Sequence, residues 1–165
     1  KEYRRQRQMC IRDSPQMTAK TEMLLYAAAR AQHVEEKVLP ALQAGKVVLS
    51  DRYVDSSIAY QAYGRGLGDM VAQVNAIATG GLVPDLTVFL DLPPAVGMAR
   101  KQQEENHELD RLEQEKLEFH QKVYEGYDAL CKKEAERICR IDASGTIEEV
   151  FGQIKEALDQ LLDRA

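Results

Sequence analysis

Apolar residues recur at helical spacing along residues 17–42. Steps of three, four or seven positions separate Met17, Leu24, Ala28, Ala31, Val34, Val38 and Leu42. This spacing places them on one face of a helix. Thr18 can cap the start of the helix, and Gly45 is suited to its end. Pro40 predicts a kink or a new helical turn within this stretch.

Three short apolar runs predict strands. They are VVLS at 47–50, LTVFLD at 86–91 and ICRID at 138–142. Residues 47–50 are apolar without alternation and rich in β-branched side chains, which is typical of a strand buried on both faces of a parallel sheet. Helical patterns fill the intervening segments, at about 69–79, 94–105, 111–136 and 146–163. Strands that alternate with helices predict an α/β fold in which helices cover both faces of a parallel sheet.

Composition narrows the class of protein. The chain has 165 residues, 44% hydrophobic and 30% charged, with a net charge of −5. The length predicts one domain, and the acidic balance argues against a broadly cationic protein that binds nucleic-acid polymers. No apolar run approaches the ~20 residues that cross a bilayer, so no membrane association is expected. The three cysteines lack disulfide or zinc spacing, which favours a cytoplasmic location.

The charge is unevenly distributed along the chain. Residues 1–14 hold five basic and two acidic residues, a net +3, so residues 15–165 hold 17 basic and 25 acidic ones, a net −8. Residues 1–14 also lack the periodicity of a buried helix or strand. We therefore expect 1–14 to be an extraneous or disordered leader and 15–165 to be the folded domain.

Candidate chemistry follows the first predicted strand. Asp51 and Arg52 stand at its carboxyl end, where parallel sheets bind ligands. The planar guanidinium of Arg52 suits a phosphate. The alternative is a structural salt bridge at the end of a strand.

A second candidate pair lies on the first predicted helix. Tyr26 and Arg30 are four residues apart and share a helical face. Together they can stack on a planar base and donate to its carbonyl oxygen. The alternative is a tyrosine that faces the core beside a solvated arginine.

The stretch 100–111 is highly charged and has few apolar residues. This composition predicts a surface loop that could close over a substrate and bring Arg100 or Arg111 to phosphates. A solvated charged face is the alternative.

Five segments in combination are far more specific than any of these features alone. They are LLYAAARAQH (24–33), VVLSDRYVDSSIAYQAYGRGLG (47–68), GLVPDLTVFLDLPPAVGMAR (81–100), LDRLEQE (109–115) and IDAS (141–144). In their order and spacing they resemble the bacterial type of thymidylate (dTMP) kinase, and the resemblance covers residues 16–165. It implies a P-loop-kinase-like fold and an ATP-dependent transfer of a phosphoryl group to dTMP, giving dTDP.

The resemblance also implies roles for residues at the dTMP side. Tyr26 is expected to stack on thymine, Arg30 to donate to a thymine carbonyl and Arg52 to hold the dTMP phosphate. The nucleoside pocket is completed by Ser56, Ser57 and Gln61, with Gln61 near the edge of the base.

At the ATP side the resemblance places Arg100 beside the adenine and Arg111 near the transferred phosphate. The turn formed by Asp142, Ala143 and Ser144 is expected to touch the adenine edge. Asp51 is expected near Mg²⁺ and the phosphates. The resemblance further implies ATP and Mg²⁺ as cofactors and a homodimer.

The 165 residues depart from the family most clearly at the phosphate loop. They contain no GxxxxGK[ST] phosphate loop, because Val47 follows the only Gly-Lys pair, Gly45-Lys46. We therefore expect that the family's first strand, phosphate loop and first helix are missing from this sequence, and that these residues alone are inactive. The alternatives are a catalytically inactive nucleoside-binding relative and a kinase for another nucleoside monophosphate.

Overall fold

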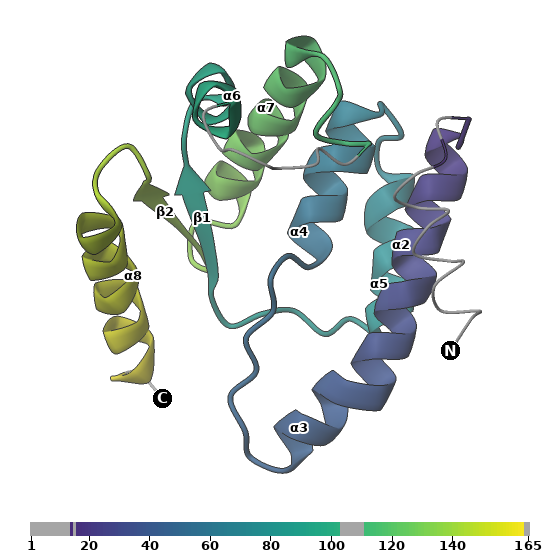
Figure 1. The fold of residues 1–165 in the computed structure, drawn as a ribbon. Coiled ribbons are helices and arrows are strands. Elements are labelled where there is room, and N and C mark those ends of the chain that lie inside the picture. The colour runs from purple at the N-terminus through teal and green to yellow at the C-terminus, as the bar shows by residue number, and fades with distance from the viewer. Residues whose placement is uncertain (1–13, 15, 103–110, 164–165) are drawn as a thin grey trace. The chain divides into compact units, whose positions relative to one another are not determined.

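The computed structural model describes residues 14, 16–102 and 111–163, so the expected leader, apart from Ser14, lies outside the described residues. The chain divides into two compact units. Unit 1 comprises Lys1–Val83 and Glu108–Gly126, and unit 2 comprises Pro84–His107 and Tyr127–Ala165. Figure 1 labels the elements of both units.

The long helix expected at the start of unit 1 is present. It begins as α2 (Ala19–His33), passes through the π-helical turn η1 (Val34–Val38) and ends as α3 (Leu39–Gln43). The Thr18 hydroxyl caps α2 by accepting from the backbone N–H of Thr21 at 3.3 Å. Pro40 stands in the first turn of α3, directly after the π-helical turn η1. The prediction of a new helical turn near Pro40 is confirmed.

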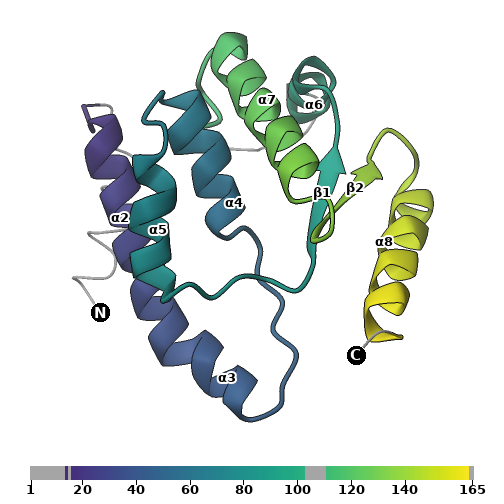
Figure 2. The same cartoon turned by 180° about the vertical axis from the view of Figure 1, so that it is seen from behind.

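The strand predicted at 47–50 is wrong. Residues 46–50 form neither a helix nor a strand, and Val47 and Leu49 are exposed. They belong to the long connection that leaves α3 (Figure 2). A strand exists only through hydrogen bonds to a neighbour, and among the described residues only one pair of strands forms a ladder. An apolar, β-branched run is therefore not sufficient to make a strand.

The sequence patterns did not predict the helical segment that follows. It consists of α4 (Val54–Ser57) and the π-helical η2 (Ile58–Gly64). The next helix, α5 (Met70–Thr79), agrees with the prediction and ends at Gly80, whose φ of 61° lies in the left-handed region that favours glycine. Helices α2 and α5 pack side by side (Figures 1 and 2). Their contact buries Met23, Ala27 and Val71 in the core of unit 1.

Unit 2 contains the two strands that the sequence predicted. β1 (Thr87–Asp91) and β2 (Ile138–Asp142) are parallel, with Thr87 opposite Ile138 and Asp91 opposite Asp142. This confirms an α/β protein with a parallel sheet, although the described sheet has two strands and not three.

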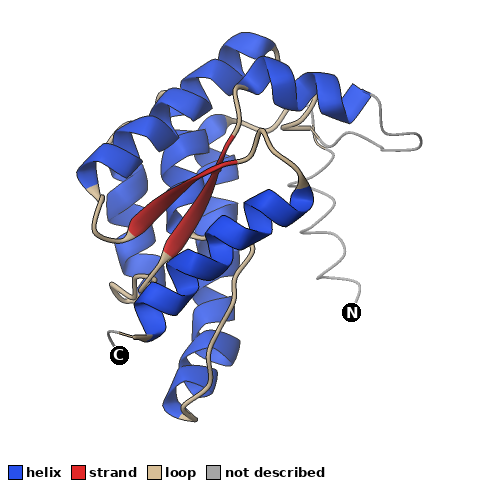
Figure 3. Cartoon of the chain, turned by 90° about the vertical axis from the view of Figure 1, so that its left-hand side faces the viewer, coloured by secondary structure: helices blue, strands red, loops and turns tan. Residues whose placement is uncertain are grey.

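Helices α6 (Pro94–Gln102) and α8 (Ile147–Leu162) complete unit 2. α8 contacts β2, and Figure 3 shows this helix beside the paired strands. A capping box starts α8, because Thr146 and Glu149 each bind the other's backbone N–H.

Helix α7 (Leu117–Lys133) starts later than the sequence predicted, and it contributes residues to both units. Residues 111–114 form turns and Glu115 a bend instead, and Arg111 and Glu115 make ion pairs within unit 1. These tertiary contacts outweigh the helical propensity of the segment. No helix in the described part of the chain is long and apolar enough to cross a membrane.

Candidate functional site

The candidate site of unit 1 is built on one face of α2. Glu22, Tyr26 and Arg30 follow each other at intervals of four residues, which aligns them along the helix. Arg30 and Glu22 hydrogen-bond to Ser57 and Gln61, which are themselves four residues apart on the α4–η2 segment. Tyr26 therefore lies midway along the face that contacts this segment.

Arg30 is enclosed by acceptors from three residues. Its Nη2 donates to the backbone oxygen of Tyr53 at 3.1 Å and to Oγ of Ser57 at 2.9 Å, and its Nη1 donates to Oδ1 of the buried Asn75. Burial lowers the pKa of Arg30, and the nearby Tyr53 and Tyr26 oppose the shift. Arg30 is thus a positioned guanidinium and not a solvated one.

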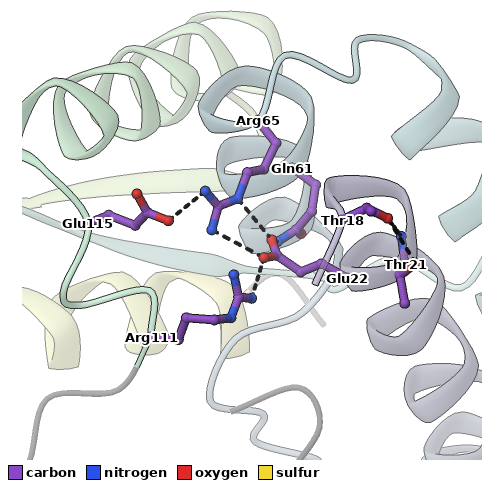
Figure 4. Close-up of polar contacts among 7 residues, drawn as sticks. All are labelled: Thr18, Thr21, Glu22, Gln61, Arg65, Arg111 and Glu115. Atoms are coloured by element: carbon purple, nitrogen blue, oxygen red, sulfur yellow. Dashed lines mark hydrogen bonds and ion pairs between the residues drawn. The ribbon is translucent and has the colours of Figure 1, made fainter. Parts of the chain in front are cut away.

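Glu22 is the centre of a buried ionic cluster (Figure 4). Its side chain is only 1% exposed, and it accepts hydrogen bonds from Gln61 Nε2 at 2.8 Å, from Arg65 Nη2 at 3.2 Å and from Arg111 Nη2. Burial by itself raises the pKa of Glu22. The bonds from Gln61 and Arg111 and the charge of Arg65 outweigh it, so the pKa lies below its ordinary value. Glu22 is therefore an ionised carboxylate that can only accept hydrogen bonds.

Arg65 joins this cluster to the start of α7. Its Nη1 lies 2.6 Å from a carboxylate oxygen of Glu115, and its guanidinium carbon lies 4.5 Å from the centroid of the Phe119 ring. The preceding Gly64 permits this approach, because a Cβ there would lie 2.7 Å from Phe119 Cε2. The cluster is thus held by close packing as well as by charge.

Asp51 and Arg52 lie at the start of the α4–η2 segment, and both are exposed. Arg52 has a φ of 64°, and among the described residues it is the only non-glycine residue in the left-handed region. Its guanidinium carbon lies 5.2 Å from the centroid of the Tyr60 ring. Unfavourable backbone conformations of this kind concentrate at functional positions.

Ser56 lies in the same short helix as Ser57 and is half-buried. No group of three or more His, Cys, Asp or Glu side chains in the described residues could hold a metal ion. A Mg²⁺ ion that arrives with nucleotide phosphates needs only one or two protein carboxylates. The exposed Asp51 fits that requirement.

In unit 2, Arg100 is close to the turn at 142–144. Its Nη1 donates to the Ala143 oxygen at 3.0 Å and its Nη2 to the Ser144 oxygen at 3.1 Å. The Ser144 N–H donates to Asp142 Oδ1 at 2.9 Å, and the hydrogen bonds from Ser144 lower the pKa of Asp142. Arg100 belongs to helix α6, so the loop predicted from residue 100 onward starts later. The remainder of that predicted loop, 103–110, lies outside the described residues.

The structure therefore divides the expected site residues between the two units. Unit 1 holds Tyr26, Arg30, Asp51, Arg52, Ser56, Ser57, Gln61 and Arg111, and unit 2 holds Arg100, Asp142, Ala143 and Ser144. Sequence reasoning missed Glu22, Arg65 and Asn75. The position of Glu22 four residues before Tyr26 was the available signal for it.

The paired parallel strands and flanking helices define an α/β protein. Comparison with known proteins narrows this class, because the family model for thymidylate kinase matches residues 3–154. The chain belongs to the thymidylate kinase family, which has the P-loop kinase fold.

Individual relatives agree with this assignment. The chain is 57% identical to a thymidylate kinase of Lactobacillus delbrueckii over 136 residues, 82% of this chain and 64% of the relative. It is 54% identical to that of Latilactobacillus sakei over 145 residues, 87% of this chain and 68% of the relative. A thymidylate kinase of a Geobacillus species is 48% identical over 151 residues, covering 90% and 72% of the two chains. The chain thus spans about two thirds of the length of the relatives that it matches.

Proposed function

We propose that this chain carries the dTMP pocket and part of the ATP site of a thymidylate kinase, an enzyme that transfers the γ-phosphoryl group of ATP to dTMP and gives dTDP. One observation supports this most directly. Arg30, beside Tyr26 on α2, donates to the Tyr53 oxygen and to Ser57. Tyr26 and Arg30 share one face of α2, so an aromatic ring and a guanidinium are available on the same side of the helix, as recognition of a planar base requires.

The residues of unit 1 divide the recognition of dTMP among them. Tyr26 stacks on thymine, and Arg30 donates to a carbonyl oxygen of the base. Arg52, exposed at the start of the segment, holds the phosphate through charge-assisted hydrogen bonds. Ser57 and Gln61 line the nucleoside, with Ser56 beside them.

The residues of unit 2 and Arg111 serve ATP. Arg100 packs beside the adenine, and the turn of Asp142, Ala143 and Ser144 borders the adenine edge. Arg111 neutralises charge at the transferred phosphoryl group. Phosphoryl transfer depends on positioning and charge neutralisation more than on covalent chemistry by the protein.

Mg²⁺ is proposed to accompany the phosphates, with Asp51 as the carboxylate that would hold it. When bound, the ion neutralises phosphate charge. We also propose that the enzyme acts in the cytoplasm as a homodimer, in keeping with the family.

Binding is the suitable test, because the 165 residues contain no GxxxxGK[ST] loop and we expect no turnover from them alone. Titration calorimetry should detect dTMP binding. Arg52→Ala should abolish this binding, and Arg30→Ala should weaken it by roughly 10- to 100-fold, as for loss of a hydrogen bond to a charged group.

Arg140→Ala is the matched control, because Arg140 pairs with carboxylates elsewhere, in unit 2. Circular dichroism verifies that each variant is folded. If the unsubstituted chain does not bind dTMP, or if Arg30→Ala binds it equally well, the proposed pocket is wrong.

A further inference from the structure

Glu22 determines which way the side-chain amide of Gln61 faces. The Gln61 amide nitrogen donates to Glu22 at 2.8 Å, and both side chains are buried. A flipped amide would set its carbonyl oxygen against a carboxylate oxygen, and neither could donate. The orientation of the amide therefore follows from chemistry.

The other charges of the cluster keep Glu22 in this role. Arg65 and Arg111 both pair with it, and Arg65 is held in turn by Glu115. A carboxylate with two cationic partners stays ionised and accepts only. Protonation, the one event that would allow the Gln61 amide to flip, is thereby disfavoured.

The remaining edge of the Gln61 amide has a defined pattern. A primary amide has two N–H groups, and the bond to Glu22 uses one of them. The carbonyl oxygen and the second N–H remain, and they lie side by side when the bond to Glu22 uses the N–H that points away from the carbonyl oxygen. No hydrogen bond within the described part of the chain uses that carbonyl oxygen.

When the Gln61 carbonyl oxygen and N–H are fixed in one order, the amide edge matches only a base edge that presents a donor opposite the oxygen and an acceptor opposite the N–H. Thymine and uracil present an imide N–H next to a carbonyl oxygen. Cytosine presents the reverse, a ring nitrogen that accepts next to an amino group that donates. An amide that is free to flip can satisfy either base, whereas an amide held in one orientation can satisfy only one of them.

We propose that Glu22 is a positioning residue that holds the Gln61 amide in the orientation that accepts from an imide N–H. The pocket then selects thymine and uracil nucleotides and rejects cytosine nucleotides. This inference rests on the proposed dTMP pocket and adds the origin of its selectivity. Glu22 does not touch the base and acts through Gln61.

The experiment compares dUMP with dCMP. Neither carries the methyl group of thymine, so the two ligands differ only in the donors and acceptors at the edge of the base. Calorimetry gives the dissociation constants for dTMP, dUMP and dCMP. In the unsubstituted chain dCMP should bind at least roughly tenfold more weakly than dUMP, because one hydrogen bond is replaced by a mismatch of polar groups.

Glu22→Gln should reduce this preference to within about threefold, because a second amide can donate or accept and so permits Gln61 to flip. The matched control is Glu115→Gln, which removes another carboxylate of the same cluster without touching Gln61. Its dCMP-to-dUMP ratio should stay unchanged. If Glu22 has a purely structural role, Glu22→Gln would weaken the binding of dUMP and dCMP equally. The ratio of their dissociation constants would then be unchanged, and the inference would be overturned.

A second measurement remains decisive if Glu22→Gln does not fold. In the unsubstituted ¹⁵N-labelled chain, one side-chain amide proton of Gln61, assigned by its loss in Gln61→Met, should be protected from exchange. Two rapidly exchanging protons would overturn the inference, as would equal affinities for dUMP and dCMP. Absence of dTMP binding would instead refute the proposed function itself, and this inference with it.

Discussion

Each unit has a cluster in which arginines meet carboxylates, and the two clusters differ in burial. In unit 1 the carboxylate of Glu22, 1% exposed, pairs with two guanidinium groups. In unit 2 the guanidinium of Arg140, 39% exposed, pairs with Asp91 and Asp128, each at 2.7 Å. The chemistry of the pairs is the same, but only the second cluster is open to water.

The difference shows why an ion pair has no fixed energetic value. Water and salt screen the cluster around Arg140 and solvate either partner when the other is removed. In the buried cluster, removal of one partner leaves charges that water cannot reach. Clusters built from the same types of residue can therefore differ several-fold in their contribution to the free energy of unfolding.

The largest effect is expected from Glu22→Ala. It removes the shared partner of Arg65 and Arg111 and should lower the free energy of unfolding by about 3–5 kcal/mol, as for other buried pairs that lose one member. Urea denaturation followed by circular dichroism measures this loss. A loss of unfolding free energy below about 1 kcal/mol would mean that this cluster contributes no more than exposed ion pairs do.

The packing beneath the buried cluster gives the next effect. Gly64→Ala would place a Cβ 2.7 Å from Phe119 and 2.9 Å from Val123, and it should cost about 1–3 kcal/mol of unfolding free energy through overpacking. The control is Gly152→Ala in α8, where nothing lies within 4 Å of the new Cβ. That variant should be stabilised by roughly 0.5–1 kcal/mol. Equal effects of the two substitutions would contradict the close approach at Gly64.

The pH dependence of stability should follow the burial of Glu22. Its pKa in the folded chain lies below the ordinary value of 4.5, so its contribution is fully present above that value. The contribution is lost as the pH falls through the lower, folded-state pKa. The stability gap between the unsubstituted chain and Glu22→Gln should therefore shrink on going from about pH 7 to about pH 3. Urea midpoints at several pH values measure this gap. A gap that widens in acid would contradict a lowered pKa of Glu22 in the folded chain.

The smallest effect is expected from the exposed cluster. Arg140→Gln should change the free energy of unfolding by about 1 kcal/mol or less, because exposed ion pairs contribute little. Urea denaturation in low and high salt is the check, and added salt should reduce the difference further. A loss as large as that of Glu22→Ala would remove the contrast between the two clusters.

The local sequence predicted the elements with clear boundaries. β1 stands between Pro84 and the pair Pro93-Pro94, and Thr18 caps its helix as expected. The sequence failed at residues 47–50, because a strand needs a hydrogen-bonded neighbour that local composition does not specify. It also failed at the segment of α4 and η2, because a π-helical turn disturbs the spacing that identifies a regular helix.

For the candidate site, spacing was sufficient where partners share one element. Tyr26 and Arg30 are four residues apart on one helix, and the structure keeps them together in the same face of α2. Glu22 escaped prediction because an acidic residue in the first turn of a helix is ordinarily solvated and needs no partner. Whether Gln61 and the other expected residues contact nucleotides stays a prediction.

By itself the sequence determined the family, the α/β class and the position of most helices and strands, because these depend on local patterns and on motifs of fixed order. Only the tertiary structure decided that Glu22 is buried. Arg111, which pairs with it, lies 89 residues away along the chain, and the hydrogen bond that orients Gln61 spans 39 residues. Burial depends on which distant segments pack together, and packing determines whether a carboxylate faces water or an arginine.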